Sequence, residues 1–283
     1  MNSALLFNYS TFGYLFASFI YVAAFLFKSN KAALGGTFFT ALTFVGQTVA
    51  LGLRWYESYQ IGIGHAPLTN MYESLVFFSW TIAGFYLFLE FKFKNRTIGA
   101  FALPFAFAAM MFAESNFSWL QISKEINPLI PALQSNWLIA HVMTCFVGYA
   151  AFAVACGIGI MYIIKDFSTN KDAGLMGTLP SLRTLDEINH KTMVFGFLWL
   201  TAGIITGAIW ANSAWGTYWS WDPKETWSLI TWFFYAAILH ARFTRGWQGT
   251  VVAWLAIGGF ISVLFTYYGV NFLLSGLHSY GSG

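Results

Sequence analysis

The chain has 283 residues, of which 58% are hydrophobic, 20% aromatic and only 9% charged. Soluble domains carry about 25% charged residues, so this composition excludes an ordinary soluble protein and indicates an integral membrane protein with several spans. The net charge of +3 is too small to indicate a nucleic-acid partner. Its distribution between loops is more informative, because basic residues set the orientation of a membrane protein.

Apolar segments long enough to cross roughly 30 Å of hydrocarbon follow one another along the whole chain. We predict spans at 10–27, 33–53, 72–91, 97–113, 137–164, 192–211, 223–244 and 250–274. The fourth span is short and contains Pro104, so we expect a kink there. Met1 to Tyr9 lack the basic start of a signal peptide, so we expect the first span to be retained. The predicted fold is all-α: one integral membrane domain, residues 1–283, forming a polytopic bundle of about eight transmembrane helices.

An even number of spans places both termini on one side of the membrane. Eleven of the 14 basic residues fall on the other side: Lys28, Lys31, Lys92, Lys94, Arg96, Lys165, Lys171, Arg183, Lys191, Arg242 and Arg245. The positive-inside rule makes that side the inner one. The outer side then has only Arg54, Lys124 and Lys224. It also carries segments 54–71, 114–136 and 210–227 and the tail Leu277–Gly283.

Tryptophan is concentrated in the outer segment 210–227. Trp215, Trp219, Trp221 and Trp227 fall within thirteen residues, and Trp210 and Trp232 extend the run to six of the 13 tryptophans. Flat aromatic side chains with one N–H donor suit either a belt at the membrane interface or a surface for a flat, mostly apolar ligand. A belt needs only one or two aromatics per helix end, so the density favours the ligand surface.

Two local patterns predict structure near this segment. Asp222, Pro223 and Glu225 occupy the N-cap, first and third positions of a capping box, which predicts that a helix begins at 223. This gives both acids a structural role without excluding a second one. Gly203 and Gly207 form G-x-x-x-G, which predicts close packing of the sixth span against another helix.

The two cysteines, Cys145 and Cys156, lie eleven residues apart in one apolar segment. A helix separates them by roughly 16 Å, too far for a disulfide, so we expect both to be packing residues. The chain has no C-x-x-C and no C-x-x-C-H, which excludes a thioredoxin-like dithiol and a c-type cytochrome.

Five histidines divide between the two sides: His65, His141 and His278 outside, His190 and His240 toward the inside. An imidazole in the membrane indicates function by default, although an interhelical hydrogen bond is the ordinary alternative. Zinc would need further thiolate or carboxylate ligands, and the outer loops have no cysteine. Two outer histidines beside an aromatic surface instead favour haem, whose iron takes axial imidazoles.

The inner histidines form a second candidate site. His240 lies about seventeen residues after Pro223, roughly 26 Å along the helix and close to the inner interface. Arg242 and Arg245 are nearby and suit haem propionates. The alternative is a cluster of cationic side chains reaching the interface, and both interpretations stay open. His190, just before the sixth span, is either the partner of His240 or a loop residue.

The run 215–225, Trp-Gly-Thr-Tyr-Trp-Ser-Trp-Asp-Pro-Lys-Glu, resembles the WWD signature of haem-handling proteins. With segments 66–74, 133–138, 207–212 and 276–281, it resembles the CcsA/ResC family, a membrane subunit of the System II cytochrome c synthase. The resemblance is strongest from about 130 to the end and includes 65–80. Residues 1–60 are similar only in hydrophobicity.

This resemblance implies that His141 and His278 are axial ligands of an outward-facing haem b and act in its attachment. The signature residues implied to hold the porphyrin are Trp215, Gly216, Tyr218, Trp219, Trp221, Asp222, Glu225 and Trp227. His240, with Arg242 beside it, is implied to ligate a second haem within the membrane, whose other ligand comes from a CcsB/ResB-type membrane subunit. His65 and His190 are further candidate ligands.

The implied activity is that of a holocytochrome c synthase, or haem lyase. It moves haem to the outer face and attaches it by thioether bonds to the C-x-x-C-H motif of apocytochrome c, in a bacterial plasma membrane or a thylakoid membrane. Thiol-reducing proteins take part indirectly. Three alternatives stay open: a WWD protein that loads a haem chaperone, a dihaem electron-transfer subunit that oxidises a quinol, and a purely structural role for the aromatic and histidine residues.

Overall fold

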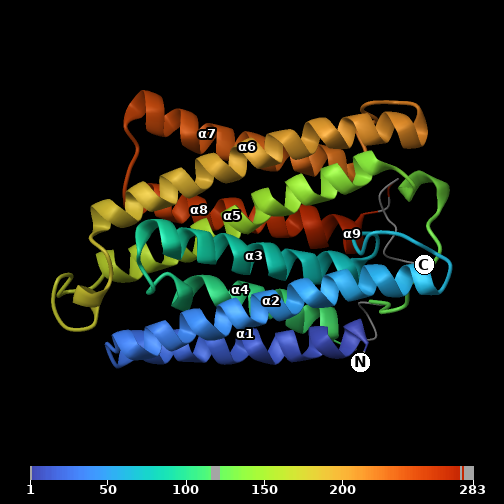
Figure 1. The fold of residues 1–283 in the computed structure, drawn as a ribbon. Coiled ribbons are helices and arrows are strands. Elements are labelled where there is room, and N and C mark those ends of the chain that lie inside the picture. Colours follow the sequence, from blue (N-terminus) through green and yellow to red (C-terminus); the bar gives the residue numbers. More distant parts are fainter. Residues whose placement is uncertain (1, 116–121, 275, 277–283) are drawn as a thin grey trace.

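The computed structural model describes residues 2–115, 122–274 and 276, and within these ranges the chain forms a bundle of long helices with no β-strand (Figure 1). An N-terminal pair, α1 (Ser3–Leu26) and α2 (Asn30–Gln60), lies along one side. The remaining helices are α3 (Met71–Phe93), α4 (Gly99–Glu114), α5 (Asn136–Asp166), α6 (Leu182–Trp215), α7 (Pro223–Arg245), α8 (Thr250–Leu264) and α9 (Val270–Leu273). A π-helical turn, Phe265–Gly269, joins α8 to α9, and short 3₁₀ turns form at Pro131–Leu133 and Met176–Thr178.

The predicted class, a polytopic helical membrane protein, is confirmed. Among the described residues, six helices are long and apolar enough to cross a membrane: α1, α2, α3, α5, α6 and the continuous helix Thr250–Leu273. The helix α4 has only 16 residues, with Pro104 inside it, and α7 carries more polar residues. Both run alongside the longer helices, so each of the eight predicted segments is a helix of the bundle (Figure 1).

Several helices extend beyond the predicted spans, and at two boundaries the difference moves a basic residue or a candidate ligand into a helix. The helix α2 continues to Gln60, so Arg54 lies within it rather than in a loop. The helix α6 begins at Leu182, so His190 is a helical residue and the loop interpretation of it is wrong. Hydropathy locates only the part of a helix that lies in hydrocarbon, whereas the first turns of α6 are polar and begin at a Ser181 cap on the Thr184 N–H.

The two ends of the bundle differ in charge. The turns after α1, α3, α5 and α7 lie at one end, and the connections after α2, α4 and α6 lie at the other (Figure 1). The first end carries most of the basic residues, and we call it the inner end under the positive-inside rule. The start of α1 and the end of α9 lie together at the outer end.

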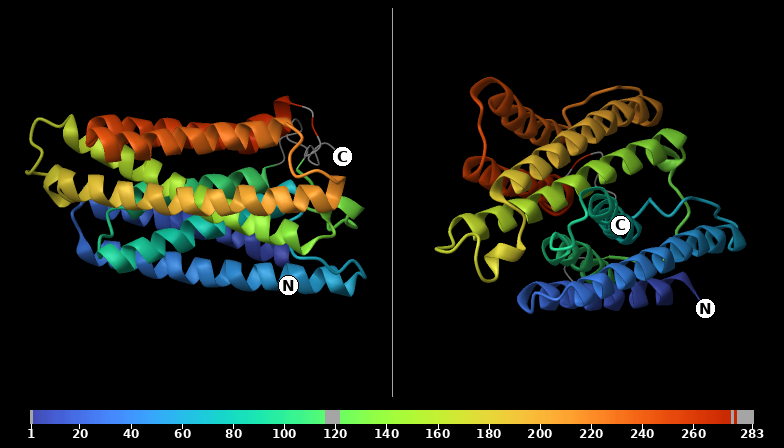
Figure 2. Two further views of the ribbon diagram at one scale, coloured as in Figure 1. Left: turned by 90° about the horizontal axis from the view of Figure 1, so that it is seen from above. Right: turned by 60° about the vertical axis from the view of Figure 1, so that its left-hand side comes forward.

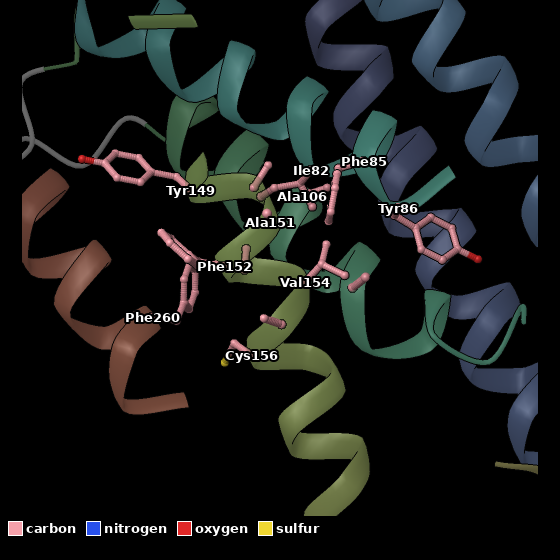
Figure 3. Close-up of a cluster of buried hydrophobic side chains, with 14 of the residues drawn as sticks. Ile82, Phe85, Tyr86, Ala106, Tyr149, Ala151, Phe152, Val154, Cys156 and Phe260 are labelled. Atoms are coloured by element: carbon pink, nitrogen blue, oxygen red, sulfur yellow. The ribbon is translucent and has the colours of Figure 1, made fainter. Parts of the chain in front are cut away.

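The helix α5 is the centre of the bundle. It packs against α6, α8, α3 and α4, and its buried face is rich in alanine, which allows these neighbours to approach closely. Phe152 of α5 lies beside Phe260 of α8, and Ile82 of α3 and Ala106 of α4 lie on the other side of α5 (Figure 3). Seen from two further directions, α1 and α2 form an outer layer on the side of the bundle opposite α7 (Figure 2). Both cysteines are buried and unbridged, as predicted.

Candidate functional site

A pocket opens at the outer end, between the start of α3, the outer halves of α5 and α6, the start of α7, and α9. The centres of water-sized molecules can occupy about 180 Å³ inside it, and its mouth is open to the outside. Its wall takes residues from four segments that lie far apart in the chain: 68–74, 133–149, 204–228 and 266–271. Most of these residues are aliphatic or aromatic, so the pocket suits a large and mainly apolar ligand.

His141 stands in the wall of this pocket, in the second turn of α5. Its Nδ1 lies 2.8 Å from the backbone oxygen of Gly203, and a carbonyl oxygen can only accept a hydrogen bond. Nδ1 therefore carries the proton, which leaves the lone pair of the neutral imidazole on Nε2. The ring also stacks on Trp210, with centroids 5.8 Å apart and planes 15° apart. A hydrogen bond from the second nitrogen is how proteins orient a metal-binding histidine.

The G-x-x-x-G pattern of α6 makes room for this arrangement. A Cβ atom on Gly207 would lie 2.6 Å from Nδ1 of His141, and one on Gly203 would lie 2.5 Å from Sγ of Cys145. The predicted close packing of α6 is confirmed, and its partner is α5. The sequence did not reveal that the same two glycines contact the His141 ring, because this contact depends on the register of α5 against α6.

The tryptophans differ in position: some line the pocket, one packs on a ring that lines it, and others lie outside its wall. Trp219 lines the pocket, together with Tyr218, which is 60% exposed. Trp210 also lines it and is almost fully buried, and its Nε1–H donates to the backbone oxygen of Ala132 at 2.9 Å. Trp215 packs edge-to-face on Trp210 at 4.9 Å, after which Gly216 ends α6 in a left-handed conformation with φ 79°.

The other signature tryptophans lie outside the pocket wall. Trp221 is 69% exposed and contacts Trp219 edge-to-face at 5.8 Å. Trp227 packs on Phe265, with centroids 4.1 Å apart. The helix-packing tryptophan Trp232 donates to Oγ1 of Thr201 at 2.8 Å. Of the run 215–227, the residues in the pocket wall are Tyr218, Trp219, Lys224 and Glu225.

The predicted capping box is confirmed at the start of α7. Glu225 also lines the pocket, and its Oε2 accepts hydrogen bonds from the backbone N–H groups of Ser220 at 2.8 Å and Asp222 at 3.2 Å. Gly276 lies against Asp222, and a Cβ there would be 3.0 Å from Cδ of Pro223. The start of α7 is thereby fixed to both the tryptophan-rich loop and the end of the described chain.

Lys224, between these acids, also lines the pocket and was not among the predicted site residues. Its Nζ donates to Oδ1 of Asn271 at 3.0 Å. Its sequence neighbourhood identified it only as a basic residue of the outer side, because nothing local shows which way its side chain points. His278 lies outside the described residues.

His65 is buried in the connection between α2 and α3. Its ring nitrogens lie 3.0 Å from the oxygen of Ala66 and 3.2 Å from the oxygen of Asn127. Its backbone exchanges two hydrogen bonds with the Ser58 hydroxyl. These contacts tie the connection 61–70 to the connection that precedes α5, so the structure gives His65 a structural role.

The inner candidate residues His190, His240 and Arg242 do not line the outer pocket. Arg242 forms a two-pronged ion pair with Asp186, at 3.0 and 2.5 Å. His190 lies one turn after Asp186 on α6, and its Nδ1 is buried without a hydrogen-bond partner among the described residues. His240 is exposed on α7. Within the described part of the chain, no group of three histidine, cysteine or acidic side chains is arranged to hold a metal ion.

Comparison with known proteins places these features in a family. The model of the family described as "Cytochrome C assembly protein" matches residues 68–278, which include every segment that lines the pocket. The "Cytochrome c biogenesis protein CcsA" of Guillardia theta is 42% identical over 98% of this chain and 97% of its own length. The protein of the same name from Gloeobacter violaceus is 39% identical over 87% and 86%.

A solved structure, "Cytochrome c Heme Lyase CcmF", has a similar fold. Its TM-score is 0.68 at 20% sequence identity, covering 98% of this chain and 48% of that one. The helical arrangement described above therefore occurs within a protein about twice as long.

Proposed function

The chain belongs to the cytochrome c assembly protein family, and from this premise we propose that its outer pocket holds haem for covalent attachment to an apocytochrome c. Its function in cytochrome c biogenesis follows from near full-length identity of about 40% to the CcsA proteins. The observation that supports the pocket as the haem site is the oriented imidazole of His141 in an aromatic wall.

In this proposal, Nε2 of His141 is an iron ligand. Its tautomer is set by the Gly203 carbonyl, which places the lone pair of the neutral ring on Nε2. We propose His278 as the second axial ligand. It follows Gly276 by two residues in the sequence, and Gly276 packs against Asp222 at the start of α7. Trp219 and Tyr218 provide aromatic contacts for the porphyrin.

The reaction itself needs little chemistry from the chain. A cysteine thiol of the C-x-x-C-H motif adds across a haem vinyl group: a sulfur–carbon bond forms at one vinyl carbon, and the thiol proton ends on the other carbon. Two such additions leave the oxidation state of the combined reactants unchanged. The protein accelerates them by holding the vinyl groups and thiols together, a haem-lyase role based on positioning.

We further propose that His240 serves a second haem that is shared with a partner. The exposed position of His240 on α7 supports this, because a ligand on the outside of the bundle needs a second protein to complete its site. A CcsB/ResB-type membrane subunit is the partner that the family resemblance implies. Arg242, held by Asp186, would help to position this region of α7 rather than contact haem directly.

The test is an absorption spectrum of the full-length chain, purified alone and together with a CcsB/ResB-type subunit, followed by addition of reduced apocytochrome c. We expect a Soret band and formation of thioether-linked cytochrome c. Haem that moves to a soluble chaperone without attachment would support the delivery alternative. Reversible reduction by a quinol would support the electron-transfer alternative, and absence of a Soret band from both preparations would contradict the proposal.

A further inference from the structure

Lys224 is the basic residue of the pocket wall. It occupies the second position of α7, where its backbone N–H donates to Oδ2 of Asp222 at 3.0 Å. The side chain is half-buried and extends to Asn271 on α9. The amide of Asn271 is itself oriented, because its Nδ2 donates to the oxygen of Tyr267 at 2.7 Å. This bond turns Oδ1 toward the ammonium group, so the position of Nζ is set by two helices.

The outer basic residues differ in how their charge is balanced. Arg54 is buried and pairs with Glu73 at 2.8 Å, and Lys124 pairs with Glu114 at 2.6 Å. Among the described residues, no carboxylate oxygen lies within 4.0 Å of Nζ of Lys224. One neutral amide oxygen satisfies one of its three N–H donors.

An ammonium group without a carboxylate is costly in a mainly apolar pocket, where little water solvates it. Two nearby acids relieve this cost only in part. Asp222 attracts the ammonium group, but none of its carboxylate oxygens lies within 4.0 Å of Nζ, and Glu225 is engaged by the N–H groups of Ser220 and Asp222. A ligand that carries its own acid group would neutralise the charge and use the remaining N–H donors.

We propose that Lys224 binds a carboxylate of the pocket's ligand, and that in the haem complex this carboxylate is a propionate. The inference rests on the function proposed above and specifies how the haem is oriented in the pocket. The propionates of haem occupy one edge of the macrocycle. When Lys224 holds that edge, the opposite edge faces away from α7, so a single cation sets which side of the porphyrin an approaching peptide meets.

The experiment compares the binding of hemin with that of hemin dimethyl ester, in which both propionates are neutral. Soret titrations are made on the full chain in detergent, for the wild type and for Lys224→Met, Lys224→Arg and Lys124→Met. A charge-assisted hydrogen bond contributes enough for the wild type to bind hemin roughly tenfold to a hundredfold more tightly than the ester. Lys224→Met should remove this preference while leaving the affinity for the ester unchanged.

Lys224→Arg should keep the preference, because a guanidinium also binds a carboxylate. Lys124→Met should keep it as well, because that lysine pairs with Glu114 and does not line the pocket. Unchanged ester binding by Lys224→Met shows that the variant is folded. Equal affinity of the wild type for both compounds, or a preference that persists in Lys224→Met, would overturn the inference and leave the haem site intact. Failure of every variant to bind either compound would contradict the proposed function itself.

Discussion

The outer and inner ends of the bundle use the same kinds of residue in opposite ways. At the outer end, His141 faces a pocket with its tautomer fixed. Lys224 reaches into the same pocket, and no carboxylate oxygen of the described residues lies within 4.0 Å of its Nζ. At the inner end, Arg242 is neutralised by Asp186, and His240 faces away from the bundle. The outer residues therefore face a pocket formed within this chain, whereas the second haem proposed at His240 needs a partner subunit to complete its site.

The largest expected effect is on the outer imidazole. His141→Ala should abolish haem retention in the outer pocket and stop cytochrome c maturation, since the proposed iron ligand is lost. External imidazole should partly restore the Soret band. His240→Ala, measured in the absence of the partner subunit, should leave the outer haem in place. Equal loss of haem in both variants would remove the distinction between the two ends.

The second-largest effect is expected at Gly207, which packs against the His141 ring. Gly207→Ala places a Cβ 2.6 Å from Nδ1 of His141, so the ring must shift from the Gly203 carbonyl. We expect haem affinity to fall about tenfold, equivalent to roughly 1.4 kcal/mol. Gly52→Ala on α2 is the matched control, because nothing lies within 4 Å of a Cβ at that position. Similar losses in the two variants would indicate a general effect on helix packing.

A smaller effect is expected from the aromatic wall. Trp219→Ala removes a pocket-lining ring and should lower haem affinity about fivefold, an aromatic contribution of roughly 1 kcal/mol. Trp227→Ala is the comparison, because that ring packs on Phe265 outside the pocket wall. Its cost should appear in thermal stability rather than in haem binding. Loss of the Trp219→Ala protein from the membrane fraction would assign that tryptophan a folding role.

The inner ion pair should affect the outer haem least. Asp186→Asn leaves the Arg242 guanidinium without its carboxylate and should destabilise the folded protein by about 2 kcal/mol, because the pair is largely buried. Hemin affinity of the outer pocket should change less than twofold. The measurements are the thermal unfolding midpoint and a Soret titration of the same preparation. A large loss of hemin binding would mean that the two ends are coupled through α6 and α7.

Local patterns in the sequence predicted much of the fold. Each of the eight segments chosen by hydropathy is helical in the described part of the chain, and loop charge gave an orientation, because each signal depends on the composition of one segment. The Asp222–Glu225 capping box was also predictable, since its donors and acceptors lie within four residues. Segments 66–74, 133–138 and 207–212 were recognised as family motifs, although their sequences did not show that they meet around one pocket.

Only the tertiary structure decided how side chains from different helices combine. It packed α5 against α6 so that Gly203 and Gly207 make room for the His141 ring. It paired Arg242 with Asp186, whereas the sequence alone suggested that Arg242 binds haem propionates. It also turned Lys224 toward Asn271, forty-seven residues later in the chain. Hydropathy and spacing describe neighbours along the chain, whereas a binding site is made by the register between helices, and that register follows from packing of the whole bundle.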